Sequence, residues 1–110
     1  KLGWFGNNSV TAAALESLAD AAIVAKKDGD MARYKTYTTV IRHTTAYLMR
    51  IQYTPDNTYH VKHRERAIGG FKKDMVNGII WMDNVWHLTS AFIKIHDAGL
   101  IDDAEVAPPM

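Results

Sequence analysis

The sequence predicts an all-α fold made of antiparallel helical hairpins. Apolar residues recur at helical spacing in three long stretches, which predicts helices over about 10–27, 31–52 and 82–97. Only a short connection at 28–30 separates the first two stretches, so we expect those two helices to run in opposite directions. With 110 residues, 47% of them hydrophobic, the chain is long enough for one ordinary domain.

Composition and charge exclude several classes of protein. The formal net charge is +1, so no overall electrostatic field favours nucleic acid as a partner. The chain has no cysteine, which excludes disulfides and thiolate metal sites and leaves the cellular compartment open. No apolar run approaches the roughly 20 residues of a membrane-spanning helix. A glycosylation sequon begins at Asn7, and no motif indicates a particular cofactor.

The first expected helix, over about 10–27, is rich in alanine. Alanine has the highest helix propensity, and its small side chain lets neighbouring helices approach closely. Glu16 and Asp20 lie one helical turn apart, and we interpret them as an acidic stripe that faces solvent.

A stop and restart signal separates the first helix from the second. Gly29 suits the left-handed end of a helix, and Asp30 suits the N-cap of the helix that follows. The second helix, over about 31–52, carries an apolar stripe on one face and basic residues elsewhere, which is typical of an amphipathic helix.

Residues 53–81 are expected to form a long irregular connection, and loops of this length tend to carry function. Gly69-Gly70-Phe71 lies in its centre, where two glycines permit positive φ angles and close backbone approach. Four basic residues surround that turn and can either hold an anionic group or form a solvated surface. These residues are Arg64, Arg66, Lys72 and Lys73.

The third helix, over about 82–97, begins with Asp83 and His87, which lie four residues apart and therefore share one face. An Asp at this spacing can orient an imidazole and support general acid–base chemistry. The alternative is structural, with Asp83 as the helix N-cap and His87 as an interior histidine with a satisfied hydrogen bond. Residues 99–110 are expected to form a C-terminal tail.

The order of these segments carries a resemblance to a known family. A helix that ends at Ile51-Gln52, a turn, Gly69-Gly70-Phe71 and a second helix resemble the repeat of the α/α-toroid superfamily, which includes terpene cyclases and protein prenyltransferase β subunits. By that resemblance, 31–52 is an outer helix, 10–27 and 82–97 are inner helices that line a central cavity, and Gly3-Trp4-Phe5 is a weaker copy of the loop. Residues 1–98 would then be partial toroid repeats.

Three helices are too few to close a toroid and would leave apolar faces exposed. We therefore expect the chain to be the C-terminal piece of a larger toroid, or to pack against partner chains that complete the helical array. The alternative is a free three-helix domain.

The resemblance implies a cavity-bearing domain, and we expect it to act on a lipid-like (terpenoid) or carbohydrate substrate by acid–base chemistry. Asp83 and His87 are the predicted catalytic pair. The predicted ligand-binding residues are Arg66, Tyr59, Phe71 and Trp86. No metal site is predicted, because His60 and His63 lie in an expected loop, where a spacing of three residues does not fix the relative positions of their side chains. The alternative is a non-enzymatic helical module that packs against partner chains.

Overall fold

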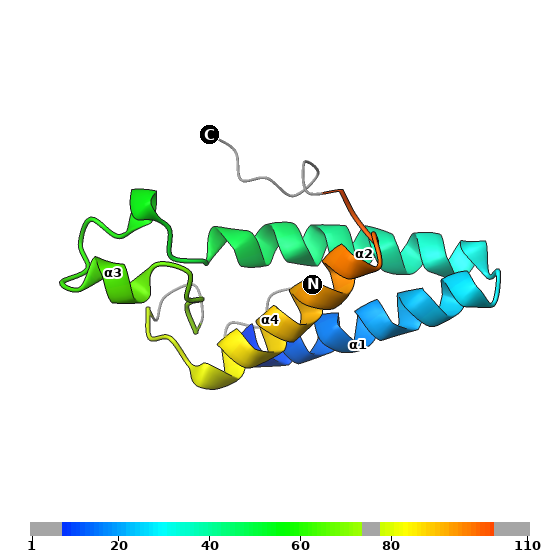
Figure 1. Cartoon of the computed structure of the whole chain (residues 1–110), viewed down its shortest axis with the longest axis horizontal. Coiled ribbons are helices and arrows are strands. Elements are labelled where there is room, and N and C mark those ends of the chain that lie inside the picture. The colour runs from blue at the N-terminus through cyan, green and yellow to red at the C-terminus, as the bar shows by residue number, and fades with distance from the viewer. Residues whose placement is uncertain (1–7, 74–77, 103–110) are drawn as a thin grey trace.

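The computed structural model describes residues 8–73 and 78–102 of the chain. Within those ranges it contains four α-helices, one short 3-10 helix and no strand, which confirms the predicted all-α class (Figure 1). The helices are α1 (Asn8–Lys27), α2 (Met31–Arg50), η1 (Pro55–Asn57), α3 (Arg64–Ala67) and α4 (Met82–Asp97). The predictions for Asn7, for Gly3-Trp4-Phe5 and for residues 103–110 lie outside the described residues.

A tight turn joins α1 to α2 and reverses the direction of the chain, so that the two helices lie side by side (Figure 1). Gly29 has a φ angle of 74°, which only glycine adopts at little cost. The Asp30 carboxylate accepts a hydrogen bond from the backbone N–H of Arg33 at 3.1 Å, as an N-cap residue does. Both predicted roles in this turn are confirmed.

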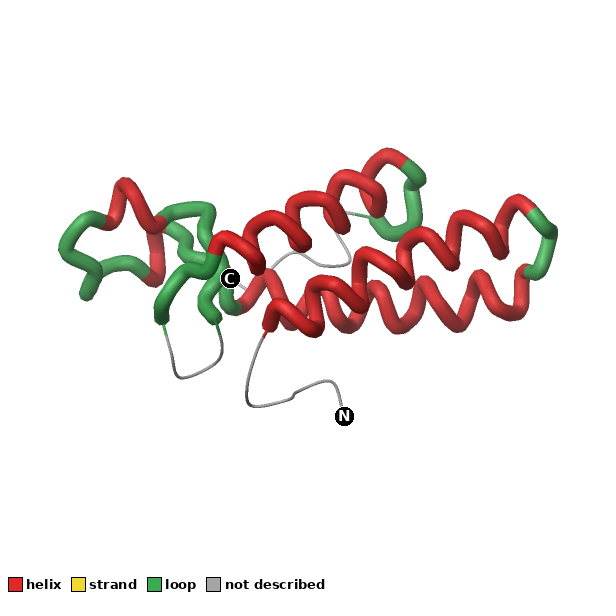
Figure 2. Tube along the Cα trace, turned by 90° about the horizontal axis from the view of Figure 1, so that it is seen from below, coloured by secondary structure: helices red, strands yellow, loops and turns green. Residues whose placement is uncertain are grey.

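The hydrophobic core lies where α1 packs against both α2 and α4 (Figure 2). Small alanines on α1 allow the neighbouring helices to approach closely, and branched side chains from those two helices pack around them. The buried members from the long helices are Ala12, Leu15, Ala19, Ala22, Ile41, Leu48, Leu88, Ala91 and Ile95.

The connection between α2 and α4 is tied to the end of α2 by backbone hydrogen bonds. Tyr53 N–H donates to Gly70 O at 2.8 Å, and Gly69 N–H donates to Tyr53 O at the same distance. Gly69 has a φ angle of 94°, and a side chain at Gly70 would come within 2.5 Å of Ile80. Gly69 therefore supplies the predicted positive φ, and Gly70 leaves room for the tip of the Ile80 side chain.

The start of α4 differs from the predicted N-cap. Trp81, not Asp83, is the N-cap residue, and it makes no side-chain capping hydrogen bond. The fully buried Asn84 instead fixes this end of the helix, because its amide donates to Lys72 O at 3.2 Å. In the part of the chain that the structure describes, no helix combines the length and apolar character needed to cross a membrane.

Candidate functional site

A cluster of polar side chains joins α1 to α4 along one edge of the core. Four of its members lie on one face of α4 at helical spacing, and two lie one turn apart on α1. The α4 members are Asp83, His87, Ser90 and Lys94, and the α1 members are Glu16 and Asp20. We refer to these six residues as the polar cluster.

Glu16 is the centre of the polar cluster. Its Oε2 lies 2.9 Å from His87 Nδ1, while its Oε1 accepts a hydrogen bond from Ser90 Oγ at 3.0 Å and lies 3.6 Å from Lys94 Nζ. The hydrogen bonds from His87 and then Ser90 lower the pKa of the Glu16 carboxyl below its ordinary value of 4.5. Partial burial acts in the opposite direction and is outweighed, so Glu16 is held as a carboxylate.

Lys94 closes the far end of the polar cluster. Its ammonium group donates a hydrogen bond to Asp20 Oδ2 at 2.9 Å. This bond, more than the charge of Glu16, raises the pKa of Lys94 above its ordinary value of 10.5. The cation therefore lies between two carboxylates on neighbouring turns of α1.

The geometry of His87 determines which of its nitrogens can exchange a proton. An ionised carboxylate only accepts hydrogen bonds, so the contact with Glu16 makes Nδ1 the protonated nitrogen of the neutral ring. The other nitrogen, Nε2, lies 3.5 Å from Asp83 Oδ1, beyond the usual range of an N–H···O hydrogen bond. The Trp86 indole stacks on the imidazole with 4.8 Å between ring centroids. One nitrogen is therefore fixed, and the other keeps a lone pair.

The structure brings together three of the residues that the sequence singles out. Asp83, His87 and Trp86 lie on the first two turns of α4. The side chains of Asp83 and His87 are 56% and 24% exposed, and Trp86 as a whole residue is 65% exposed. The predicted pair is present, but Asp83 is the more distant of the two carboxylates that face the imidazole.

The other three predicted ligand-binding residues lie away from this group. Phe71 is buried in the core, where its ring lies 5.7 Å from that of Phe92. Tyr59 is 86% exposed beside η1 and touches only the ring of His60 among the aromatic contacts of the described residues. Arg66 lies exposed on α3. The structure therefore does not gather the four predicted ligand-binding residues into one site.

The basic residues around the Gly-Gly turn mostly have partners within the chain. Arg64 donates to Pro55 O at 2.9 Å. The Lys72 and Lys73 ammonium groups lie over the rings of Tyr53 and Trp81, at 5.3 and 4.4 Å from the ring centroids. No group of three or more His, Asp or Glu side chains within residues 8–73 and 78–102 is arranged to hold a metal ion.

Sequence reasoning missed the role of Glu16 and Ser90. The interpretation of Glu16 as part of a solvated stripe is wrong, because only 26% of its side chain is exposed and three α4 side chains contact it. A signal was present in the sequence, since Glu16 lies one turn from the buried Ala12 and Ala19, which places it at the edge of the helix contact. Its partner on α4 depends on how the two helices pack.

Comparisons with known protein families, with curated proteins and with solved structures found no match to this chain. The resemblance to the α/α-toroid superfamily therefore stays a prediction.

Proposed function

We propose that His87 is a general acid–base group for a substrate that binds beside Trp86 at the start of α4. The observation that carries this proposal is the hydrogen bond between His87 Nδ1 and Glu16, a carboxylate that Ser90 and Lys94 hold in place. A carboxylate that orients an imidazole through one nitrogen leaves the other nitrogen available for proton transfer.

The proposed chemistry is the transfer of one proton at His87 Nε2. The neutral ring accepts a proton from a substrate hydroxyl or activated water at Nε2 while Nδ1–H stays bonded to Glu16. The imidazolium that forms then has carboxylates on both sides, Glu16 at 2.9 Å and Asp83 at 3.5 Å. Returning the proton from Nε2 to a leaving oxygen restores the neutral ring and completes the cycle.

The surroundings of His87 favour a substrate with an apolar face. Trp86 stacks on the imidazole and is 65% exposed, and Met82, one turn earlier, is 84% exposed. An exposed indole can stack on a sugar ring or cover an aliphatic chain. This surface supports the lipid-like or carbohydrate substrate class predicted from the sequence, with Trp86 as the binding residue and without Arg66, Tyr59 or Phe71.

Hydrolysis of p-nitrophenyl acetate and of p-nitrophenyl glycosides tests the proposal. We expect the wild-type chain to release p-nitrophenol from at least one of these probes faster than the His87→Gln variant. The matched control is His63→Gln, because His63 also faces a carboxylate, Glu65 at 3.7 Å, but is exposed and lacks the supporting contacts. Equal rates for wild type and His87→Gln, with folded variants, would refute the acid–base role.

A second candidate function follows from the outward face of α4. Met82, Trp86 and Ile93 are 84%, 65% and 56% exposed, and their spacing of four and seven residues places them on one stripe. We propose that this stripe packs against a further helix, from a partner chain or another segment, which would complete a helical array such as the α/α-toroid. The support for this proposal is the exposed apolar surface, because a helix that buries only its inner face usually has polar residues on its outer face.

Light scattering over a range of concentrations tests this second function. A chain whose outward helix face needs a partner should associate with itself when no other helix is supplied, and Ile93→Lys should prevent that association. Val24→Lys is the control, because Val24 is equally exposed at 56% but lies on α1. A wild-type chain that stays at 12.4 kDa at every concentration would contradict the proposal.

A further inference from the structure

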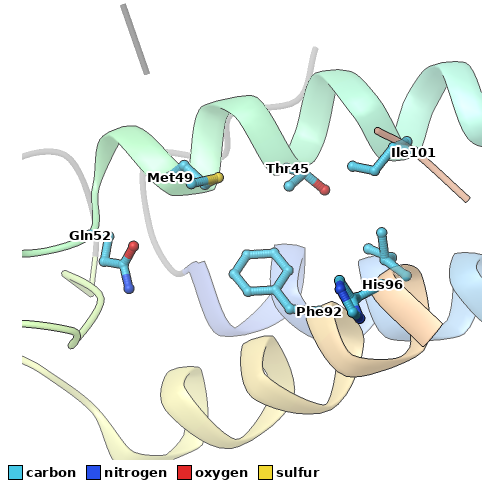
Figure 3. Close-up of a pocket in the computed structure, with 7 residues that line it drawn as sticks. Thr45, Met49, Gln52, Phe92, His96 and Ile101 are labelled. Carbon is cyan, nitrogen blue, oxygen red and sulfur yellow. The ribbon is translucent and has the colours of Figure 1, made fainter. Parts of the chain in front are cut away.

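A cavity lies on the other side of α4 from the polar cluster, between α4 and α2 (Figure 3). Its volume is about 250 Å³, and its walls are mostly apolar. The lining residues are Thr45, Met49, Gln52, Phe92, Ile95, His96 and Ile101. The polar cluster lies on a different face of α4, so this cavity is independent of the proposed acid–base site.

A buried hydroxyl group without a hydrogen-bond partner lies in the wall of the cavity. Thr45 is 4% exposed, and its Oγ1 makes no hydrogen bond in the structure. Thr38 and Thr39, on the same helix, instead donate to backbone carbonyls one turn earlier, at 2.9 and 2.8 Å. Figure 3 shows the Thr45 side chain on the side of α2 that faces Phe92 and His96. A buried hydroxyl is costly to leave unpaired, and a group from a bound molecule would satisfy it.

The lining residues also define the charge and size of that molecule. Among them only His96 can carry a charge, and its Nδ1 lies 3.3 Å from Asp97 on the exposed surface. No lysine or arginine in the lining faces a carboxylate or phosphate, so the complementary ligand is neutral. An apolar protein cavity of about 150 Å³ holds benzene, and by that scale this cavity holds about ten non-hydrogen atoms.

We infer that this cavity binds a neutral, mostly apolar molecule of about ten non-hydrogen atoms with one carbonyl or hydroxyl group. The Thr45 side chain borders the ligand, and a rotation about its Cα–Cβ bond brings the hydroxyl to the oxygen of the ligand, while Met49, Phe92 and Ile95 contact its apolar part. Small-molecule sites commonly combine apolar walls with one or a few polar groups that fix orientation.

Acetophenone and ethylbenzene are the probes for this inference, because they have similar shapes and only the first carries an acceptor oxygen. Binding is followed by the NMR shifts of the methyl groups of Met49, Ile95 and Ile101. We expect acetophenone to bind the wild-type chain about 5-fold more tightly than ethylbenzene, the effect of one hydrogen bond. Thr45→Val should remove that preference, and Thr45→Ser, which keeps the hydroxyl, should retain it.

Thr38→Val is the matched control, because Thr38 is buried on the same helix and its hydroxyl is already bonded to Tyr34 O. This variant should keep the preference for acetophenone. The inference is overturned if neither probe shifts the three methyl groups up to its solubility limit. It is also overturned if the two probes bind the wild type equally, or if Thr45→Val keeps the preference.

Discussion

Helix α4 contacts α1 on one side and faces α2 across a cavity on the other. On the α1 side, Glu16 accepts hydrogen bonds from His87 and Ser90, and Lys94 donates to Asp20. On the α2 side, the Thr45 hydroxyl is buried without a partner beside a cavity of about 250 Å³. The polar groups of the first contact are paired with one another, whereas the second contact borders a cavity and includes a hydroxyl that no protein atom pairs.

This difference separates two roles that a helix contact can have. Paired polar groups at the edge of a packed core fix the position of each side chain, which proton transfer at His87 requires. An apolar cavity bordered by one polar group that no protein atom pairs is the arrangement that small-molecule sites commonly have. The same helix therefore carries His87, the proposed acid–base group, on one face and borders the proposed binding cavity with another.

The largest expected effect is the difference in free energy of unfolding between an apolar truncation on the α1 side of α4 and one on the α2 side. Leu88 is fully buried in the core cluster that includes Leu15 of α1, so Leu88→Ala should lower the free energy of unfolding by about 2–5 kcal/mol. Met49 borders the cavity and is only partly buried, so Met49→Ala should cost about 1 kcal/mol. Denaturant unfolding measures both values, and equal losses would show that the α2 side is as tightly packed as the α1 side.

A smaller effect should distinguish two threonines of α2. Thr38→Val removes a hydroxyl that is bonded to Tyr34 O, so it should lower the free energy of unfolding by about 1 kcal/mol. Thr45→Val removes an unpaired hydroxyl from an apolar setting, so it should leave stability unchanged or raise it by about 1 kcal/mol. Thermal unfolding without added ligand gives the signs, and a loss at Thr45 equal to that at Thr38 would contradict the account of the cavity.

The smallest effect concerns the acid dependence of stability. Hydrogen bonds lower the pKa of Glu16 in the folded chain, so the ionised Glu16 carboxylate contributes fully to the stability of the fold at pH values above its ordinary pKa of 4.5. That contribution is lost as the pH falls through the lowered pKa, because the folded chain must then take up a proton. Glu16→Gln should therefore be less stable than wild type at pH 7, and the difference should shrink below pH 4.5.

Thermal unfolding at several pH values measures this change. Asp28→Asn is the control, because Asp28 is an exposed carboxylate in the turn between α1 and α2. We expect the control to follow the wild-type profile. A difference between wild type and Glu16→Gln that stays constant from pH 7 to acid would show that the Glu16 carboxylate is not held by the polar cluster.

The helices could be predicted because their signals are local. Apolar spacing predicts the three long helices, and Gly29 and Asp30 predict the turn between the first two, where the structure has a positive φ and an N-cap. The same spacing places Asp83 and His87 on one face of α4. Short helices such as α3 give almost no periodicity, so the sequence indicates only an irregular connection there.

The composition of the site could not be predicted from local spacing. Glu16 and His87 are 71 residues apart in sequence, and their contact depends on the angle and register at which α1 and α4 pack. The sequence indicates Asp83 as the partner of His87 because the two residues are four apart on the same helix. The positions of Phe71 and Tyr59 could not be predicted for another reason: residue type alone cannot distinguish a buried aromatic side chain such as Phe71 from an exposed one such as Tyr59.

The central claim is that Glu16 fixes His87 so that Nε2 keeps a lone pair for proton transfer. Nitrogen-15 NMR of the imidazole, at a pH high enough to make the ring neutral, tests this claim most directly. We expect the proton of neutral His87 on Nδ1 in the wild-type chain, and a loss of that preference in Glu16→Ala. A proton on Nε2 in the wild type would contradict the claim, because the nitrogen proposed to accept a proton would already carry one.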